Sequence, residues 1–191
     1  MAAKLAEAEQ MTVEEFLAFY DARPKGEKWE LIEGIAVMSP TPTEWHQVIA
    51  GNIIIMLMAH KTATNARWIP MIGVGTRVPV SPRSLPQPDV FVKQGAPQDA
   101  SITADALILF EVLSKSNTRS DQLWRKRVYA SVPNCQHYVT IATKSAECVR
   151  FDRADGWTGA HKVKGLADVL ELPAIGASLP LRDIYRWTPI A

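Results

Sequence analysis

Apolar and polar positions along the chain follow helix and strand periods in turn, beginning with a short helix and a hairpin. Residues 11–20 carry an amphipathic helical pattern, in which Thr12 is the expected N-cap and Glu15, three positions later, completes a capping box. Residues 29–32 and 35–38 are two short strand-like runs around a Glu-Gly pair, which favours a tight turn. We therefore expect a helix that packs on the core, followed by a β-hairpin.

The middle of the chain predicts one long helix and several strands. In residues 43–60, apolar side chains recur at spacings of three and four, which predicts a helix that is largely buried. Residues 68–80 are expected to supply two short strands. Residues 89–93 and 107–113 are the strongest strand candidates, joined by a loop of small and polar residues.

A second helix and further strands are expected in the remaining part of the chain. Asn117 or Thr118 can cap a helix that runs to about residue 131, where Pro133 prevents its continuation. Asp155-Gly156 is a turn signal between two later strand candidates. These later strands are expected at residues 136–142, 147–152 and 157–163.

Length and composition point to a globular protein with one domain. A chain of 191 residues can bury a substantial core but is too short for two ordinary domains. We expect residues 1–10 to form a flexible N-terminal tail and residues 11–191 a single domain. Because the formal net charge is only +1, the protein is not one that coats nucleic acid through bulk charge. Any site for a polyanion must therefore be local.

Neither a membrane span nor an export signal is recognisable in the sequence. The longest strongly apolar stretch, residues 53–58 with its flanks, falls short of the roughly 20 residues that a spanning helix needs. The first ten residues include acids and lack the apolar block of a secretory signal. Cys135 and Cys148 form no CxxC unit and are too few for a disulfide framework. We expect a protein of the reducing cytoplasm.

Two carboxylates stand inside or beside strongly apolar strands. Asp89 opens one predicted strand, and Glu111 follows 22 residues later within the other. Burying an unpaired charge costs several kcal/mol, and two such charges on neighbouring strands would repel each other. A divalent cation removes that repulsion, so the pair predicts a metal site at the edge of the sheet. The alternative is that each carboxylate is satisfied separately by a backbone amide or an arginine.

Three more polar side chains fall on faces that are expected to point inward. His46 continues the apolar stripe of its helix, and strand alternation places Glu30 toward the core. Lys126 shares a helical stripe with Tyr129, three positions later. Each has a plainer explanation, namely a hydrogen-bonded histidine in the core, a structural glutamate and a snorkelling lysine. Together with Asp89 and Glu111, however, they suggest a site rather than a set of structural groups.

Basic side chains are concentrated between residues 115 and 127. This segment has five basic residues against one acid, a local balance of +4. Such an excess suits phosphate binding, although a solvated helix face has similar composition. Hydroxyl groups at the expected helix entrance can also contact an anion. The residues concerned are Lys115, Arg119, Arg125, Lys126 and Arg127, with Asp121 as the acid and Ser114, Ser116 and Thr118 as the hydroxyl groups.

The order of these residues resembles the Uma2 family of restriction endonuclease-like proteins, a branch of the PD-(D/E)xK nuclease fold. The resemblance covers residues 29–185, and its fragments are specific only in their combined order and spacing. It rests on Trp29-Glu30-Leu31-Ile32-Glu33-Gly34, Met38-Ser39-Pro40-Thr41-Pro42 with His46, Pro88-Asp89-Val90, Glu111-Val112-Leu113-Ser114, and Asp121, Lys126 and Tyr129. The resemblance implies an α/β, restriction endonuclease-like fold with a mixed central β-sheet flanked by helices.

The resemblance also implies a set of metal ligands. Carried over to this chain, Asp89 and Glu111 are the ligands, with the carbonyl of Val112 as a third. Glu30 is the acid contributed by the early part of the core, and His46 is an additional pocket residue. Carboxylate and carbonyl oxygens with open water positions suit Mg²⁺ or Mn²⁺.

The lysine of the family motif is missing from its usual place in this chain. Leu113 stands two residues after Glu111, where the motif has lysine. The resemblance implies that Lys126 on the following helix takes over its role. Where relatives have Ser-Pro-Ser-Thr, this chain has Ser114-Lys115-Ser116-Asn117, so Lys115 is a second candidate.

The expected function is hydrolysis of phosphodiester bonds in DNA by a metal-dependent endonuclease, assembled as a homodimer. Asp89, Glu111, Lys126, Glu30 and His46 are the expected catalytic residues. Substrate binding is expected from Ser114, Lys115, Ser116, Arg119, Arg125 and Tyr129. The alternative is a nuclease-like fold without catalytic activity that binds nucleic acid or protein. A third possibility is that the polar groups are structural.

Overall fold

The computed structural model of the chain describes residues 10–114 and 117–191. The N-terminal residues 1–9 of the predicted tail lie outside the described residues. The two predicted substrate-binding residues Lys115 and Ser116 also lie outside them.

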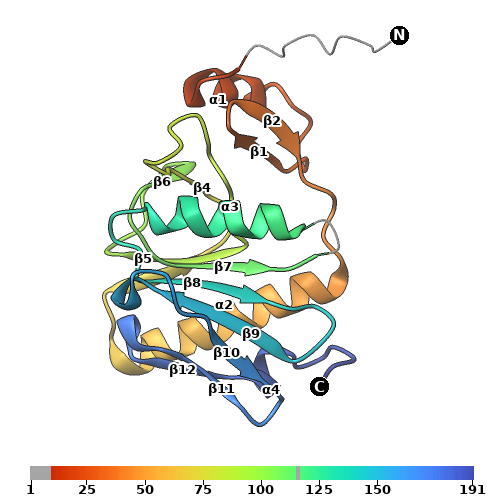
Figure 1. Cartoon of the computed structure of the whole chain (residues 1–191), viewed down its shortest axis with the longest axis vertical. Coiled ribbons are helices and arrows are strands. Elements are labelled where there is room, and N and C mark those ends of the chain that lie inside the picture. The colour runs from red at the N-terminus through yellow and green to blue at the C-terminus, as the bar shows by residue number, and fades with distance from the viewer. Residues whose placement is uncertain (1–9, 115–116) are drawn as a thin grey trace.

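A six-stranded mixed sheet forms the centre of the molecule (Figure 1). Its strand order is β10-β9-β8-β7-β5-β3, and β7 and β8 are parallel whereas the other neighbouring strands are antiparallel. The predicted fold class, an α/β protein with a mixed central sheet flanked by helices, is therefore confirmed. The strands are β3 (Trp68–Met71), β5 (Val90–Gln94), β7 (Ala106–Val112), β8 (His137–Ile141), β9 (Glu147–Asp152) and β10 (His161–Lys164).

Each face of the sheet is covered by a helix. Along β7, Ile108 and Phe110 belong to the core on the side of α2 (Glu44–Thr64), together with Ile53 of that helix. Leu109 belongs to the core on the opposite side, together with Val128 of α3 (Arg119–Ala130). This alternation follows from the two-residue period of a strand and leaves β7 buried on both faces. Glu111 has the phase of Leu109, so its side chain lies on the α3 side.

The N-terminal segment forms a separate small layer above the sheet (Figure 1). Helix α1 (Val13–Asp21) begins with the predicted capping box of Thr12 and Glu15. The predicted hairpin is formed by β1 (Trp29–Ile32) and β2 (Ile35–Met38). Leu31 of this hairpin pairs with Leu85, which fixes the hairpin beside the segment that leads into β5. Two short parallel strands, β4 (Gly75–Thr76) and β6 (Ile102–Thr103), complete this region.

The structure differs from the sequence prediction in two regions, namely the long helix α2 and the C-terminal part of the chain. Helix α2 continues to Thr64 and is buried along one stripe only, since Ile55 is 61% exposed. The last part of the chain, for which no element was predicted beyond residue 163, forms a hairpin and a short helix that pack against α2. None of the helices in the described part of the chain is long and apolar enough to cross a membrane. The C-terminal elements are β11 (Val169–Leu172), β12 (Ala177–Pro180) and α4 (Leu181–Ile184), with 3₁₀ turns at Arg153–Asp155 and Pro173–Ile175.

Candidate active site

The sheet brings Asp89 and Glu111 directly opposite each other. Strands β5 and β7 pair antiparallel, with Val90 opposite Phe110. The same register, continued by one residue, places Asp89 opposite Glu111, and the backbone N–H of Asp89 donates to the carbonyl of Phe110 at 3.1 Å. Opposite residues of an antiparallel pair project from the same face. Because β5 and β7 are interior strands of the sheet, the pair lies where β5 begins and β7 ends, at the edge formed by the strand ends.

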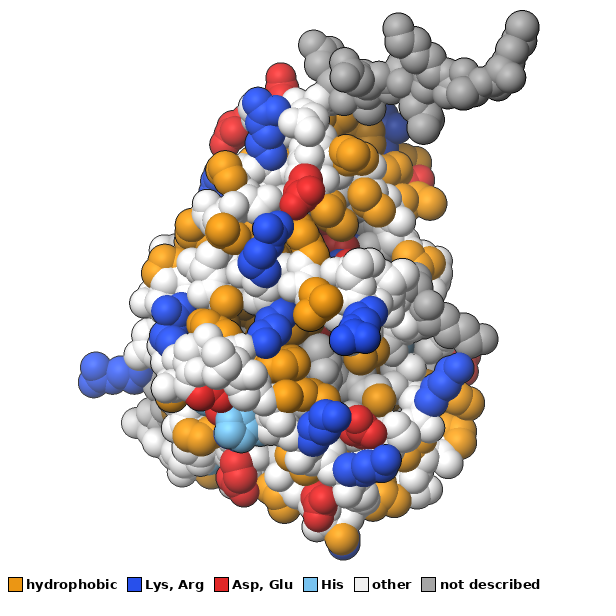
Figure 2. All heavy atoms as spheres, in the orientation of Figure 1, with side chains coloured by type: hydrophobic (Ala, Val, Ile, Leu, Met, Phe, Trp, Pro, Cys, Tyr) orange, Lys and Arg blue, Asp and Glu red, His pale blue; other side chains and the backbone are white. Residues whose placement is uncertain are grey.

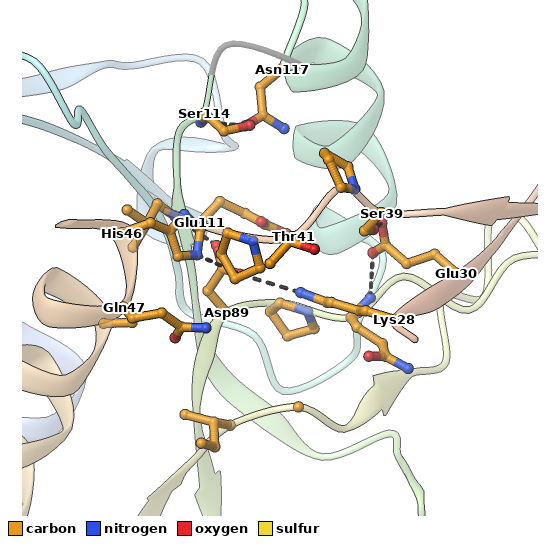
Figure 3. Close-up of a pocket in the computed structure, with 18 of the residues that line it drawn as sticks. Lys28, Glu30, Ser39, Thr41, His46, Gln47, Asp89, Glu111, Ser114 and Asn117 are labelled. Atoms are coloured by element: carbon orange, nitrogen blue, oxygen red, sulfur yellow. Dashed lines mark hydrogen bonds and ion pairs between the residues drawn. The ribbon is translucent and has the colours of Figure 1, made fainter. Parts of the chain in front are cut away.

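A pocket of about 710 Å³ opens at these strand ends (Figure 3). The central sheet supplies its acidic floor, the hairpin β1–β2 and the loop after it supply one wall, and α2 and α3 supply the others. Most of the predicted site residues line it, although they come from distant parts of the sequence. These lining residues are Glu30, His46, Asp89, Glu111, Val112, Ser114 and Arg125.

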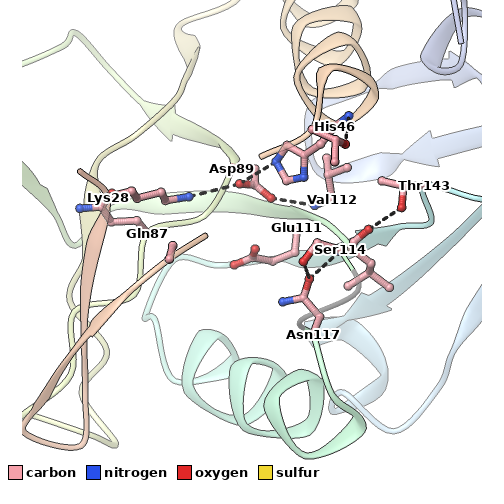
Figure 4. Close-up of polar contacts among 12 residues, drawn as sticks. Lys28, His46, Gln87, Asp89, Glu111, Val112, Ser114, Asn117 and Thr143 are labelled. Carbon is pink, nitrogen blue, oxygen red and sulfur yellow. Dashed lines mark hydrogen bonds and ion pairs between the residues drawn. The ribbon is translucent and has the colours of Figure 1, made fainter. Parts of the chain in front are cut away.

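Asp89 is held by three donors (Figure 4). Its Oδ1 lies 3.2 Å from Nε2 of His46 and 3.3 Å from Nζ of Lys28. Its Oδ2 accepts a hydrogen bond of 2.9 Å from the backbone N–H of Val112. Burial opposes ionisation of Asp89, but the His46 hydrogen bond and the Lys28 charge outweigh it, so that the pKa of this carboxyl is lowered. The contact that Val112 makes with Asp89 thus comes from its N–H group, whereas its carbonyl was the predicted ligand.

Glu111 is bound by two residues of α3. Its Oε1 accepts hydrogen bonds from Nη1 of Arg125 at 2.9 Å and from the hydroxyl of Tyr129 at 2.7 Å. Within the described chain, Oε2 has no hydrogen-bond partner. Burial raises the pKa of Glu111 to about 8, because the Arg125 charge compensates only in part and the charges of Asp89 and Glu30 add to the effect.

Arg125 is the centre of a buried network that joins three carboxylates. It donates to both oxygens of Glu30, with 2.7 Å between Nη2 and Oε2, in addition to its bond with Glu111. Its Nε lies 3.4 Å from Oδ1 of Asp121, which gives an ion pair without a hydrogen bond. Burial works against ionisation of Glu30, but the bidentate guanidinium contact outweighs it and lowers the pKa of Glu30. Arg125 therefore organises the acids, and the N–H groups that it directs at Glu30 and Glu111 are not available to grip a phosphate as predicted.

Lys126 does not lie in this pocket, which corrects its assignment as the active lysine. Consecutive helix residues are turned by about 100°, so only one of the two neighbours can face the acids. The buried residues of α3 are Arg125, Val128 and Tyr129, and Lys126 instead lies over the ring of Phe151, 4.4 Å from its centroid. The sequence pattern predicts Lys126 and Tyr129 on one inward face of this helix. In the structure, the inward face contains Arg125 and Tyr129, four positions apart, and Lys126 does not belong to it. Arg119 is exposed and also lies outside the pocket.

The remaining predicted residues lie at the pocket wall. Ser114 lines the pocket, and its backbone N–H and hydroxyl both donate to Oδ1 of Asn117. Asn117 in turn donates to Asp121 at 3.1 Å. Tyr129 is fully buried and does not line the pocket; its hydroxyl donates to Glu111 and accepts a hydrogen bond of 3.3 Å from Nη1 of Arg125, and both of these residues line the pocket.

Lys28 is a pocket residue that sequence reasoning missed. It comes from the start of the hairpin, and its ammonium contacts Asp89 while 35% of its side chain remains exposed. Burial lowers the pKa of Lys28, but the charges of Asp89, Glu111 and Glu30 more than compensate, so the pKa is raised. A signal was available, because strand alternation places Lys28 on the same side as Glu30, two positions later.

The charge of the pocket suits a hard cation. Five carboxylate side chains line it against two cationic ones, a formal balance of −3 when all the acids are ionised. Oε2 of Glu111 has no partner in the described chain, and Oδ2 of Asp89 accepts one hydrogen bond, so both have capacity for a metal. The acids are Glu27, Glu30, Asp89, Glu111 and Asp121, and the cations are Lys28 and Arg125.

A tighter cluster of metal-ligating side chains lies elsewhere among the described residues. Ligand atoms of Asp152, Asp155 and His161 all lie within 4.8 Å of one another. Asp152 is already bound by Arg150 and by His137, with 2.6 Å between its Oδ1 and Nδ1 of His137. This cluster therefore has structural partners of its own.

Comparison with solved structures supports the fold. Five solved chains match significantly, among them a crystal structure from Anabaena variabilis described as a "putative nuclease belonging to DUF820". It is 14% identical, covers 93% of this chain and 98% of its own, and superposes with a TM-score of 0.75. At this identity the likeness shows the fold alone. A search of curated proteins gives no significant match.

Comparison with family models gives a match over most of the chain. The sequence model of Uma2, described as "Putative restriction endonuclease", matches residues 13–182. This range includes the pocket residues from Lys28 to Arg125, and it agrees with the resemblance seen in the sequence motifs. The chain belongs to the Uma2 family.

Proposed function

We propose that the protein is a divalent-metal-dependent endonuclease that hydrolyses phosphodiester bonds in DNA. The observation that carries this proposal is the cross-strand pair of Asp89 and Glu111 at the floor of a pocket with excess carboxylate. Such a pocket repels a phosphodiester unless a cation neutralises it. Membership of a family described as restriction endonucleases favours this reaction over other uses of a metal.

Asp89 and Glu111 are the residues that would hold the metal, Mg²⁺ or Mn²⁺. When bound, the ion would supply charge neutralisation for the phosphoryl group and an activated water. The two carboxylate oxygens leave open positions for water and substrate, as these hard cations require. His46 would position Asp89 through its hydrogen bond at Oδ1, which leaves Oδ2 directed away from the histidine.

Lys28 is the chain's own candidate for the lysine of the motif. It replaces Lys126 in this role because its Nζ lies 3.3 Å from the carboxylate of Asp89. An ammonium at this position would hold the attacking water or a phosphate oxygen next to the acids. Arg125 would act as a positioning residue, since it fixes the side chains of Glu30 and Glu111.

One observation favours the alternative, a nuclease-like fold that binds without cutting. Both carboxylates at the pocket floor already have protein cations as partners, Glu111 through Arg125 and Asp89 through Lys28. An acid satisfied in this way does not require a metal. The two proposals therefore differ in whether a metal competes successfully with these ion pairs.

Calorimetric titration with Mn²⁺ tests the proposal. The wild-type protein should bind Mn²⁺, and Asp89→Asn and Glu111→Gln should each abolish or strongly weaken that binding while the fold is retained by circular dichroism. Asp152→Asn is the matched control, because it removes a carboxylate from the other acidic cluster. Binding that is absent, or that depends on Asp152 alone, would eliminate the metal-dependent enzyme.

Plasmid nicking in Mg²⁺ and Mn²⁺ then tests the reaction itself, with single-stranded RNA as a second substrate. Cleavage of DNA by the wild type and none by Glu111→Gln is the expected result. A homodimer and a reducing cytoplasmic setting belong to the same proposal, as does a single nuclease domain over residues 11–191. The two cysteines, Cys135 and Cys148, are free and buried, which is compatible with that setting.

A further inference from the structure

A second groove lies on the other side of α3. It has a volume of about 260 Å³ and is enclosed by α3 and by strands β8, β9 and β10. The residues of α3 that line it are spaced three, four and seven positions apart and form a face distinct from that of Asp121 and Arg125. Its full lining is Arg119, Gln122, Leu123, Lys126, Tyr138, Thr140, Val149, Phe151, Ala160 and Lys162.

The charge of this groove is opposite to that of the pocket. Three of its lining residues, Arg119, Lys126 and Lys162, are basic, and none is acidic. Within residues 10–114 and 117–191, none of the three forms an ion pair with a carboxylate. Figure 2 views the molecule from this side and shows basic side chains across the middle of the face, with apolar side chains between them. Unpaired cations around an apolar floor form a site for a phosphate group attached to a less polar moiety.

Tyr138 of β8 forms part of the floor of the groove. Tyr138 is 1% exposed and lines the groove, and its hydroxyl has no hydrogen-bond partner in the described part of the chain. A buried hydroxyl without a partner costs free energy, so a structure normally supplies one. Tyr129 on the neighbouring helix shows the contrast, because its hydroxyl is satisfied by Glu111. The Tyr138 side chain therefore contributes to the floor of the groove, whereas its hydroxyl is closed off from the groove.

We infer that this groove binds a backbone phosphate of a nucleic-acid strand whose other phosphates reach the pocket across α3. This inference rests on the proposed function, since it assigns the grip on the substrate to a surface away from the carboxylates. Phosphate contacts of this kind hold and orient a strand without reading its sequence.

The groove also accounts for Arg119 and Lys126, two basic residues of α3 that the pocket does not use. The ammonium group of Lys126 lies over the ring of Phe151. Those of its N–H groups that do not face the ring can donate to an anion at the mouth of the groove. Lys162 approaches from β10, so the cations come from two sides of the groove. A phosphate between them would replace the mutual repulsion of like charges by attraction.

Fluorescence anisotropy with a labelled DNA hairpin tests the inference. The parent protein is Asp89→Asn in EDTA, so that neither cleavage nor metal binding contributes. Lys126→Gln with Lys162→Gln should weaken binding roughly tenfold or more near 0.1 M salt and reduce the slope of log K against log[salt] by about 1.8. Arg182→Gln, an exposed cation on α4 outside both cavities, is the charge-matched control and should change little.

Two outcomes would overturn the inference. The first is a double variant that binds the hairpin as the parent does, or no more weakly than Arg182→Gln. The second is a double variant that loses affinity for AMP, measured by NMR titration, but retains its affinity for the hairpin, which would assign the groove to a free nucleotide. Because these measurements need neither metal nor cleavage, a failure of the proposed nuclease activity does not imitate either outcome.

Discussion

The two sides of α3 differ in which charge is in excess and in whether that charge is paired. On the pocket side, carboxylates outnumber cations and each cation is bound to an acid. On the groove side, three cations have no carboxylate partner among the described residues. One helix thus separates a surface that attracts cations from a surface that attracts anions.

The difference shows why a local count of charges is a poor guide to function. Arg125 and Lys126 are neighbours in the sequence and both contribute to the basic excess of residues 115–127. Arg125 is buried among acids and serves to organise them, whereas Lys126 lies at the groove. Their roles follow from the helical phase, which separates two adjacent side chains by about 100°.

Removal of a pocket carboxylate should have the largest effect on activity. Asp89→Asn or Glu111→Gln should lower the rate of DNA cleavage by roughly a thousandfold or more, because a bound metal contributes several kcal/mol to the transition state. Lys126→Gln should change mainly the affinity for DNA. Single-turnover plasmid cleavage at saturating protein separates the two effects. Equal losses of rate in the three variants would contradict the assignment of different roles to the two sides of α3.

Removal of the central guanidinium should have the largest effect on stability. Arg125→Met leaves the buried carboxylates of Glu30 and Glu111 without their cation, which should cost about 3–5 kcal/mol of unfolding free energy. Lys126→Met, one position later, should cost less than about 1 kcal/mol, because the half-buried side chain loses only its cation–π contact with Phe151. Urea unfolding followed by circular dichroism measures both. A cost of Arg125→Met similar to that of Lys126→Met would show that the network is not buried as described.

The raised pKa of Glu111 should make stability depend on pH. In the unfolded chain this carboxyl ionises near 4.5, whereas in the folded protein its pKa is about 8. Between these values the folded state binds more protons than the unfolded state, so the unfolding free energy should fall as pH rises, by at most about 1.4 kcal/mol per pH unit. Urea unfolding between pH 5.5 and 8.5 measures this slope in metal-free buffer. Glu111→Gln should reduce the slope of unfolding free energy against pH, whereas Lys126→Gln should leave it unchanged. An unchanged slope in Glu111→Gln would show that other groups cause the pH dependence.

Two tyrosines provide the smallest contrast between the two sides. Tyr129→Phe removes a hydroxyl that donates to Glu111, which should cost about 1–3 kcal/mol. Tyr138→Phe removes a hydroxyl that has no partner within residues 10–114 and 117–191, so the unfolding free energy should change by less than about 0.5 kcal/mol or should rise. Differential scanning calorimetry can resolve this difference. A larger loss in Tyr138→Phe than in Tyr129→Phe would mean that the Tyr138 hydroxyl has a partner in solution.

The sequence was sufficient for much of the fold because its strongest signals are local. The capping box of Thr12 and Glu15 and the apolar runs of β5 and β7 determine their elements from neighbouring residues alone. The C-terminal hairpin was not predicted, because its strands alternate exposed and buried positions over only four residues each. Its apolar face becomes recognisable only through its packing on α2.

The candidate site could be predicted in part for the same reason. Asp89 and Glu111 could be identified because each is an acid in or beside an apolar strand. This signal does not require knowledge of how the two strands pair. Lys28 was missed because its contact with Asp89 is made between residues 61 positions apart, and Arg125 was misassigned because a weak stripe does not fix the phase of a polar helix. Long-range pairing and helical phase are properties of the folded structure.

Diffraction from a crystal soaked in Mn²⁺, recorded with the anomalous signal of manganese, tests the central claim most directly. The account predicts an anomalous peak bonded to one oxygen of Asp89 and one of Glu111, at about 2.1 Å from each, in the pocket beside Lys28. A peak only at Asp152, Asp155 and His161, or no peak with Arg125 and Lys28 still bound to their acids, would contradict it.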